Sequence, residues 1–433
     1  MASQEILRSA VPPYPGPLPK SRANHLYGDY FNNCNISYGL QFHAACAKHV
    51  EETFHASRIL ILASATLARS TSALSDLQAS LGTKVAGVKL GLRAHTYFSD
   101  TLAIAEECRV LGVDLIVTLG GGSLTDAAKM ISLVLANDVH NADELLKLPT
   151  QVTAGTVPPA KPSTVPVIII STTLSGGEFT LGCGTTDDRD NQKHQFVVDT
   201  VVKLVILDAA LVTATTPLLL FVQSGVRALD HCIEALCSPY STEVTEMHAN
   251  ASLGRLVPGL LRCIADGDTK TDVEARLLCQ MASIDAIASC VRVYSPLGGS
   301  HAIGHILGPF GVVHGATSGI LLPAVCKYNA RRSADAAKRQ AGAKAILWSV
   351  PEMRSLAESK GLVEAEGGAD LGDLLDVFVR ALGMARTLAD VGVGRDKFDK
   401  LAEFSVLDPS ALTNPVPLKE PAQVMEILEM VAE

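Results

Sequence analysis

The sequence has no block of basic residues. Its 36 Lys and Arg are outnumbered by 45 Asp and Glu, which gives a formal charge of −9 at pH 7. A protein that binds nucleic acid usually gathers positive charge on one face or along one helix. This charge balance therefore argues against nucleic acid as a partner.

Paired cysteines are also missing. The ten cysteines are scattered without a Cys-x-x-Cys motif, and the proline-rich opening residues contain no apolar core of a signal peptide. Disulfide frameworks form in oxidising compartments, so this pattern indicates reduced thiols in an intracellular protein. We expect residues 1–25 to form an extended N-terminal arm.

The chain lacks a long uninterrupted apolar run as well. Its longest apolar stretch, Val201–Val222, is broken by Lys203, Asp208 and Pro217. A membrane-spanning helix needs roughly 20 consecutive, mostly apolar residues. The sequence therefore predicts a cytoplasmic protein with no membrane partner.

What the chain does have is enough apolar residues for a large core. Of its 433 residues 48% are hydrophobic, which suits two packed domains. In the first half, short β-branched runs alternate with helical segments, a pattern typical of parallel strands joined by helices. The expected strands are Arg58–Ala63, Lys84–Leu90, Asp114–Leu119 and Val165–Ile170.

Helical periodicity replaces the strand pattern after Asp208. We predict an α/β domain with a Rossmann-like parallel sheet over residues 26–207 and an all-α domain over residues 208–433. The helices expected in the second domain include 216–234, 243–264, 272–290, 299–307, 371–382, 395–405 and 422–431.

Three glycines follow the strand Asp114–Leu119, in the sequence GGGSLTDAAKM from Gly120 to Met130. Glycines let the backbone approach a phosphate closely, and the free N–H groups of the helix that follows favour an anion. The loop fits neither the GxGxxG fingerprint nor the GxxxxGK[ST] motif. On this motif alone, an ordinary glycine-rich turn remains an alternative.

The loop GGGSxxDxAK resembles the cofactor loop of the iron-containing alcohol dehydrogenase superfamily, and further segments resemble that family in the same order. One of them, STTLSGGEFT, has the shorter form typical of maleylacetate reductases. The resemblance runs from about residue 27 to the C-terminus and implies a dehydroquinate synthase-like fold and an NAD(P)-dependent oxidoreductase. The other segments are LDAAL (207–211), GVRALDHCIE (225–234), GGSHAIGHILGPFGVVHG (298–315) and TNPVPL (413–418).

The resemblance also implies which residues contact the nucleotide. In NAD-preferring relatives an aspartate after the first strand repels a 2′-phosphate, whereas Ser64 stands here, with Arg69 close behind. NAD(P)H is therefore the expected cofactor, with a lean towards NADPH. The remaining contacts would be Gly121, Gly122, Ser123 and Asp126 at the pyrophosphate and nicotinamide ribose, and Thr172, Thr173 and Leu174 at the adenine and its ribose.

One arginine and several histidines make up the other matching segments. Metal-binding relatives use an Asp and a His four residues apart, followed by two more histidines. By alignment, those positions are Arg227, His231, His301 and His314. The four-residue spacing places Arg227 and His231 on one helical face, as it does His301 and His305.

Arg227 thus stands where those relatives carry a carboxylate ligand. A guanidinium stays protonated and has no lone pair to give a metal. Beside a divalent ion in a poorly solvated pocket, its repulsion is on the order of several kcal/mol. Asp230 is expected to face elsewhere, because it lies about 100° around the helix from His231. We therefore expect no catalytic metal.

Maleylacetate reductases likewise lack the aspartate and work without metal, so the resemblance points to that branch. It implies reduction of an activated carbonyl or a conjugated enone, with an anionic small molecule as substrate. His305 is the candidate general acid. Arg227 would hold a carboxylate or enolate oxygen, and His231 and His301 would orient it.

Other interpretations stay open at this point. The three remaining histidines could serve a zinc or iron alcohol dehydrogenase, since three His and a water form a known catalytic zinc set. A dehydroquinate synthase-like lyase or cyclase would recycle its NAD within each turnover. A binding protein could keep the fold without the chemistry. The family's habit implies a homodimer.

Overall fold

The computed structural model describes residues 4–16, 18, 30–93, 96–150, 153, 156–365 and 368–433. They divide into two compact units. The first unit holds Tyr30–Thr216 with the described residues up to Pro13, and the second holds Pro217–Glu433 with the stretch that begins at Tyr14. The phenol of Tyr14 donates a hydrogen bond to Glu243 within the second unit (2.9 Å).

A seven-stranded sheet forms the centre of the first unit, in the order β1-β2-β9-β6-β5-β3-β4. Neighbouring strands are parallel except β1 and β2, which are antiparallel. The predicted parallel sheet and its four predicted strands, β3 to β6, are confirmed. The strands are β1 (Ile6–Ser9), β2 (Asn35–Tyr38), β3 (Ile59–Ala63), β4 (Val85–Leu90), β5 (Leu115–Gly120), β6 (Val167–Ser171) and β9 (Val202–Leu207).

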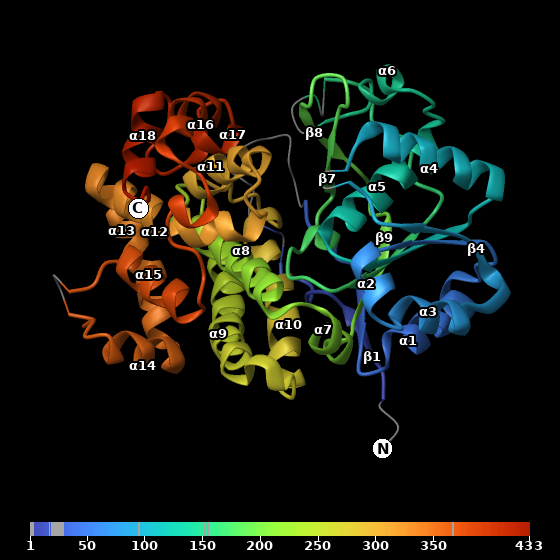
Figure 1. Cartoon of the computed structure of the whole chain (residues 1–433), viewed down its shortest axis with the longest axis horizontal. Helices are drawn as coiled ribbons and strands as arrows, with labels where there is room; N and C mark the ends of the chain where they lie inside the picture. Colours follow the sequence, from blue (N-terminus) through green and yellow to red (C-terminus); the bar gives the residue numbers. More distant parts are fainter. Residues whose placement is uncertain are drawn as a thin grey trace. The chain divides into compact units, whose positions relative to one another are not determined.

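Helices cover both faces of this sheet, as buried parallel strands require. Figure 1 shows α1 (Phe42–His49) and α3 (Ala73–Leu81) on one side and α4 (Phe98–Leu111) and α5 (Gly122–Asn137) on the other. On the α1 side, alternate residues of β3, such as Ile59 and Ile61, pack in one buried cluster with side chains of both helices. The shorter helices of this unit are α2 (Ala65–Ser70), α6 (Ala142–Leu145) and α7 (Ala209–Thr215).

The polar segment 187–195 belongs to a hairpin. It links β7 (Gly182–Thr186) to β8 (Lys193–Val197), which form a separate antiparallel pair. Asp187 closes the turn, because its carboxylate accepts hydrogen bonds from both the backbone and the guanidinium of Arg189.

The expected extended arm of residues 1–25 is described at 4–16 and 18, and the rest of it lies outside the described residues. Its opening is a strand of the sheet, because Ile6–Ser9 pairs with Asn35–Tyr38. The pairing is reinforced by Glu5, whose carboxylate contacts Lys48 (2.6 Å) and His49 (2.7 Å). These partners hold the pKa of Glu5 at about 2, against the burial that raises it.

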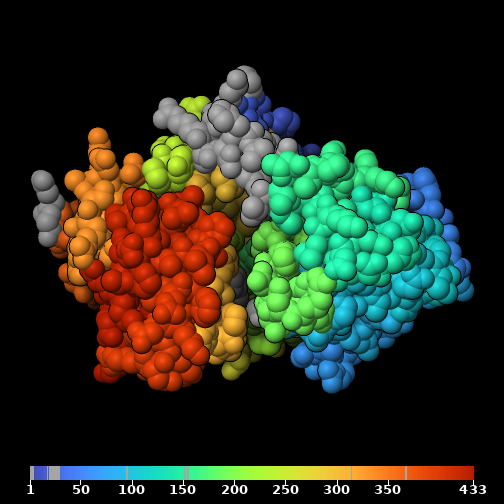
Figure 2. All heavy atoms as spheres, turned by 90° about the horizontal axis from the view of Figure 1, so that it is seen from above, coloured from blue at the N-terminus to red at the C-terminus, as the bar shows by residue number. Residues whose placement is uncertain are grey.

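The second unit is helical, as predicted, and its long helix α8 (Leu218–Cys237) is enclosed by neighbouring helices: every residue from Ser224 to Cys237 is buried. Figure 2 shows the last part of the chain, in red, as one contiguous face of this unit. The other helices are α9 (Glu243–Asp266), α10 (Val273–Val291), α11 (Gly299–Leu307), α12 (His314–Arg332), α13 (Ala334–Ser349), α14 (Pro351–Ser359), α15 (Leu371–Ala381), α16 (Phe398–Ser405), α17 (Pro409–Thr413) and α18 (Pro421–Glu429).

The sequence analysis predicted no membrane-spanning helix and no disulfide framework. Among the helices that the structure describes, none combines the length and the apolar character needed to cross a bilayer. All ten cysteines are described, and each is a buried free thiol.

Candidate functional site

The glycine loop of the first unit lies between β5 and α5, where Gly121 is the N-cap of the helix. No side chain caps this end, so the first N–H groups of a helix that continues to Asn137 remain available to an anion. The backbone here is closely approached: a Cβ on Gly121 would lie 3.1 Å from Thr173 Cγ2. A side chain at this position would therefore crowd Thr173.

The loop also stands at the point where the order of strands reverses. From β3 the chain first adds β4 on one side and then β5 on the other. Ligands of open α/β sheets bind beyond the carboxyl ends of the strands at such a point. Three predicted nucleotide contacts gather there: Ser64 follows β3, Gly121 follows β5 and Thr172 follows β6.

Short contacts connect these three strand ends. The N–H of Thr172 donates to Gly120 O (3.0 Å), and a Cβ on Gly120 would lie 3.2 Å from Ser64 Cβ. Ser64 caps α2 by accepting from Leu67 N (3.4 Å). The three strand ends therefore lie close together.

The remaining predicted nucleotide residues differ in exposure. Ser123 is exposed on the first turn of α5, while Asp126 is half-buried and accepts from Gly184 N (3.2 Å). Burial raises the pKa of Asp126, and the nearby lysine charges oppose that rise. Thr173 is half-buried beside Gly121, whereas Leu174 is buried. Their contacts with a nucleotide stay predictions.

A buried lysine, which the sequence analysis left unassigned, fixes the back of this loop. Lys129 on α5 is fully buried. Its ammonium donates to the carbonyl oxygens of Gly177 (2.6 Å), Thr180 (3.1 Å) and Gly182 (2.5 Å). These bonds tie the helix to the segment that leads into β7, so the charge is satisfied by backbone dipoles.

In the second unit, the predicted polar residues come together around Arg227. This arginine is 5% exposed. Its Nη2 lies 3.4 Å from His305 Nε2, and its Nη1 donates to Ser318 Oγ (3.2 Å). The rings of His231 and His301 stack with centroids 4.9 Å apart. Arg227, His231, His301 and His305 thus form one cluster on α8 and α11. The side chain of His314 lies outside the description.

The expectation that Asp230 faces away from this cluster is wrong. Its carboxylate oxygen Oδ2 accepts from Ser300 Oγ (2.8 Å) and Ser318 Oγ (2.6 Å), and it lies 3.7 Å from Arg227 Nη1. A rotation of about 100° removes a side chain from one helical face, but α8 is surrounded on all sides. The rotation therefore points Asp230 at α11 and α12.

Glu234 is a second acidic member that the sequence analysis did not identify. Its carboxyl group lies 2.7 Å from His301 Nδ1 and accepts from the backbone N–H groups of Gly298 and Ser300 (both 2.8 Å). The side chain thereby holds the start of α11, which has no side-chain cap of its own. The signal was available, because Glu234 follows Asp230 by four residues on the same helical face.

His305 has an acidic partner of the same kind. Its Nδ1 lies 2.8 Å from Asp408 Oδ2, and the other oxygen of Asp408 accepts from Ser410 N (2.8 Å) at the start of α17. The His305 side chain is 35% exposed, compared with 1% for the residue His301. Sequence patterns give no hint of this pair, because 103 positions separate its members.

Burial and charge set the protonation of the cluster. Burial, together with the charges of Arg227 and His305, lowers the pKa of His231 to about 3, so its imidazole is neutral at physiological pH. Burial raises the pKa of Asp230 to about 6, against the pull of Arg227. Burial and the neighbouring Asp230 charge raise that of Glu234 to about 8.

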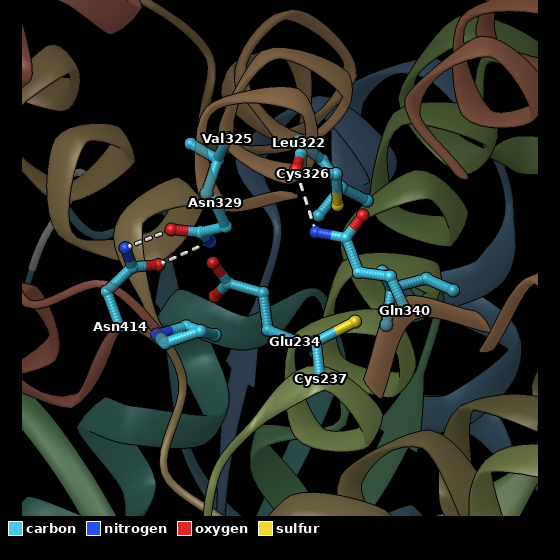
Figure 3. Close-up of a pocket in the computed structure, with 10 residues that line it drawn as sticks. Glu234, Cys237, Leu322, Val325, Cys326, Asn329, Gln340 and Asn414 are labelled. Atoms are coloured by element: carbon cyan, nitrogen blue, oxygen red, sulfur yellow. Dashed lines mark hydrogen bonds between the residues drawn. The ribbon is translucent and has the colours of Figure 1, made fainter. Parts of the chain in front are cut away.

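Figure 3 shows a small cavity that Glu234 helps to line. Its volume is about 10 Å³, enough for one water molecule at most. At its edge Asn329 and Asn414 exchange hydrogen bonds through their amides (3.0 and 2.7 Å). Asn414 Oδ1 also accepts from Gly299 N (3.0 Å). This cavity is structural and too small for a substrate.

One group of possible metal ligands is already engaged in other contacts. Ligand atoms of Asp230, Glu234 and His301 lie within 4.8 Å of one another. Both Glu234 oxygens and one Asp230 oxygen, however, already accept hydrogen bonds. The guanidinium of Arg227 stands 3.7 Å from Asp230 Oδ2. A metal there would displace those donors and face a fixed cation in a buried pocket.

Comparison with known proteins supplies the context. The chain matches the model of iron-containing alcohol dehydrogenases over residues 39–209 and that of the C-terminal part of the Fe-containing alcohol dehydrogenase family over residues 221–432. It is 35% identical to the dehydrogenase FUM7 of Gibberella moniliformis, with 92% of this chain and 96% of that protein covered. It is 27% identical to the maleylacetate reductase of Sphingobium indicum, with 92% and 96% covered.

A solved structure shows the same fold. The sulfoacetaldehyde reductase of Bifidobacterium kashiwanohense, in complex with NAD+, superposes with a TM-score of 0.74 at 19% identity. The superposition covers 94% of this chain and 98% of that one.

Proposed function

The chain belongs to the iron-containing alcohol dehydrogenase family and is an oxidoreductase, and we propose that it is a metal-independent reductase of an activated carbonyl or a conjugated enone. Bound NAD(P)H would supply the hydride. The first unit would hold the nucleotide at the glycine loop, and the second unit would bind and protonate the substrate.

The observation that carries this proposal is the buried cation at the position where metal-binding relatives are expected to have a carboxylate. Arg227 is 5% exposed and is held by Ser318 and His305. As hydride arrives at a carbonyl carbon, negative charge develops on the oxygen. A fixed guanidinium in a poorly solvated pocket stabilises that charge without a Lewis acid.

The histidines complete the chemistry with different roles. His305 would donate the proton, because it combines contact with Arg227 and access to solvent. His231 and His301 would orient the substrate oxygen. His231 is neutral at physiological pH, so it adds no repulsion to Arg227. A substrate with its own carboxylate or an enolate oxygen would gain a two-pronged contact with the guanidinium.

The choice between NADH and NADPH rests on the end of β3. Ser64 presents no negative charge to a 2′-phosphate, which supports the use of NADPH. Arg69 is exposed, although its Nε donates to Ala65 O within its own helix (3.1 Å). Its terminal nitrogens would meet the phosphate. We further propose that the protein acts in the cytoplasm as a homodimer on an anionic small molecule.

Metal content and cofactor turnover test this proposal. Purified protein should show no stoichiometric zinc or iron, and chelation should leave its NAD(P)H oxidation unchanged with an activated carbonyl or enone substrate. The control variant Arg227→Asp restores a carboxylate at the ligand position and should gain metal binding.

Three outcomes would replace the proposal. Stoichiometric zinc or iron required for turnover would favour an alcohol dehydrogenase that uses His231, His301 and His314. Product formation without net NAD(P)H consumption would favour a lyase or cyclase. Failure to bind either nucleotide would favour a binding protein.

A further inference from the structure

The carboxylate that touches His305 comes from a distant part of the chain. Asp408 precedes α17, and one of its oxygens accepts from Ser410 N (2.8 Å) as the helix cap. Its other oxygen lies 2.8 Å from His305 Nδ1. One oxygen of the carboxylate is thus held by the backbone, and the other contacts the imidazole. Together these two bonds fix the direction of the His305 ring.

The geometry determines which nitrogen of His305 carries hydrogen. A carboxylate accepts and a guanidinium donates, so Nδ1 carries the proton towards Asp408 and Nε2 presents a lone pair to Arg227 Nη2 at 3.4 Å. When Nε2 gains a proton, that lone pair is gone and the contact with Arg227 becomes repulsive. The new N–H must then find another acceptor, such as a substrate oxygen.

We propose that Asp408 is the positioning residue of the general acid: it holds His305 in the Nδ1–H tautomer and stabilises the imidazolium that delivers a proton from Nε2. In the reduction, the hydride bonds to the electrophilic carbon, the C=O or C=C π electron pair moves onto the far atom of the substrate, and Nε2 gives up its proton. His305 returns to the neutral form and takes its next proton from solvent, to which 35% of its side chain is exposed.

The charged groups around His305 divide into two sets. Asp408 favours the imidazolium, whereas Arg227 and the nearby histidines His231 and His301 do not. Asp408 is itself held ionised. Burial would raise its pKa, but the hydrogen bonds from His305 and Ser410 hold the pKa below its usual value. The ionised Asp408 therefore keeps a negative charge beside His305, on the side of the ring away from Arg227.

The decisive variant is Asp408→Asn, studied in the full-length protein. The amide keeps an oxygen to cap α17 and loses the negative charge beside Nδ1. We expect the pKa of His305 to fall, because a carboxylate beside an imidazole favours its charged form. In the reduction, the alkaline decline of kcat should then begin at lower pH, because His305 must be protonated to act. At neutral pH, kcat should fall about tenfold or more, with little change in the dissociation constant of NAD(P)H.

A direct measurement separates this inference from the proposed function, on which it rests. Histidine labelled with the heavy nitrogen isotope reports tautomer and pKa by NMR without any substrate, and His305→Gln assigns the signal. We expect the Nδ1–H form in the native protein and a mixture in Asp408→Asn. Asp408→Glu should recover part of the activity. Asp272→Asn, which makes the same change at the cap of α10, should keep the native pH profile.

Two results would overturn the inference. One is an unchanged His305 pKa and tautomer in Asp408→Asn. The other is a loss of kcat with an unshifted pH profile, which would make Asp408 a purely structural cap. If the native protein fails to oxidise NAD(P)H while the NMR shifts appear as expected, the proposed function fails and the pairing stands.

Discussion

Arg227 is the residue whose surroundings constrain the chemistry most. It is almost completely buried, and the carboxylate of Asp230 stands 3.7 Å away. Burial lowers the pKa of Arg227, and the charges of Asp230 and Glu234 oppose that change. A guanidinium nevertheless remains protonated in proteins. The cation is therefore a permanent part of the pocket and acts on every neighbouring group that titrates.

Arg227→Met tests this role at the scale of one side chain. Methionine keeps much of the volume and removes the charge. Removal of a single oxyanion donor lowers kcat by about 10²–10³-fold, and we expect a loss of that size. The pKa of His231 should rise from about 3, because Arg227 is one of the causes of its depression. Steady-state kinetics and an NMR titration measure the two effects.

A matched control comes from another buried arginine of the same unit. Arg276 is 3% exposed and lies over the ring of Phe221, with Cζ 5.4 Å from the centroid. Arg276→Met should lower stability while leaving kcat and the pKa of His231 unchanged. Equal losses of activity in both variants would mean that Arg227 acts through packing alone.

At the scale of the element, the glycine loop combines an uncapped helix with a crowded backbone. A Cβ at position 121 would meet both Cγ2 (3.1 Å) and Oγ1 (3.4 Å) of Thr173. An added methyl group would therefore crowd Thr173 at the start of α5.

Gly121→Ala is accordingly expected to weaken nucleotide binding. An effect of about tenfold or more in the dissociation constant corresponds to about 1.4 kcal/mol, within the range of a local clash. Fluorescence titration with NADH and NADPH measures it. Gly254→Ala is the control, since no atom lies within 4 Å of its new Cβ and alanine favours a helix interior. That variant should bind as the native protein does. Unaltered binding by Gly121→Ala would remove the loop from the nucleotide site.

Some secondary-structure elements could be predicted from sequence patterns alone. Runs such as Ile59–Ala63 and Leu115–Gly120 are buried on both faces and read plainly as strands. α12 was not predicted, because Gly315, Gly319 and Pro323 interrupt its helical pattern while neighbouring helices supply the packing that keeps it folded.

The side chains of α8 show where sequence patterns fail to predict the site. The four-residue spacing brought out Arg227 and His231, which share one helical face. The same rule assumes that the opposite face meets solvent, and it failed for Asp230 because that face meets α11 and α12. No rule based on neighbouring residues in the sequence could predict Asp408, because its contact with His305 depends on the folding of the whole second unit.

Across the whole molecule, the reactivity of the thiols reports whether the fold is intact. All ten cysteines are buried, and burial raises the pKa of several of them, including Cys46, Cys232 and Cys237, to about 12. The thiolate is the reactive form of cysteine. Burial keeps a reagent away from these thiols, and the raised pKa keeps them protonated, so both effects oppose their modification.

Ellman's reagent should therefore react with almost none of these thiols in the native protein and with all ten after unfolding in urea. A reductant should leave the melting temperature unchanged, because the chain holds no disulfide. Rapid reaction of several thiols before unfolding would show that a buried segment opens readily.

The cradle and the polar cluster share no side chain among the described residues. Lys129, Gly121 and Ser64 all precede Thr216, while Arg227, Glu234 and Asp408 all follow it. On the proposed function, side chains from separate parts of the chain would thus set nucleotide preference and substrate preference. A recombinant that joins residues 1–216 of this chain to the helical half of a relative would inherit its nucleotide preference from one parent and its choice of substrate from the other.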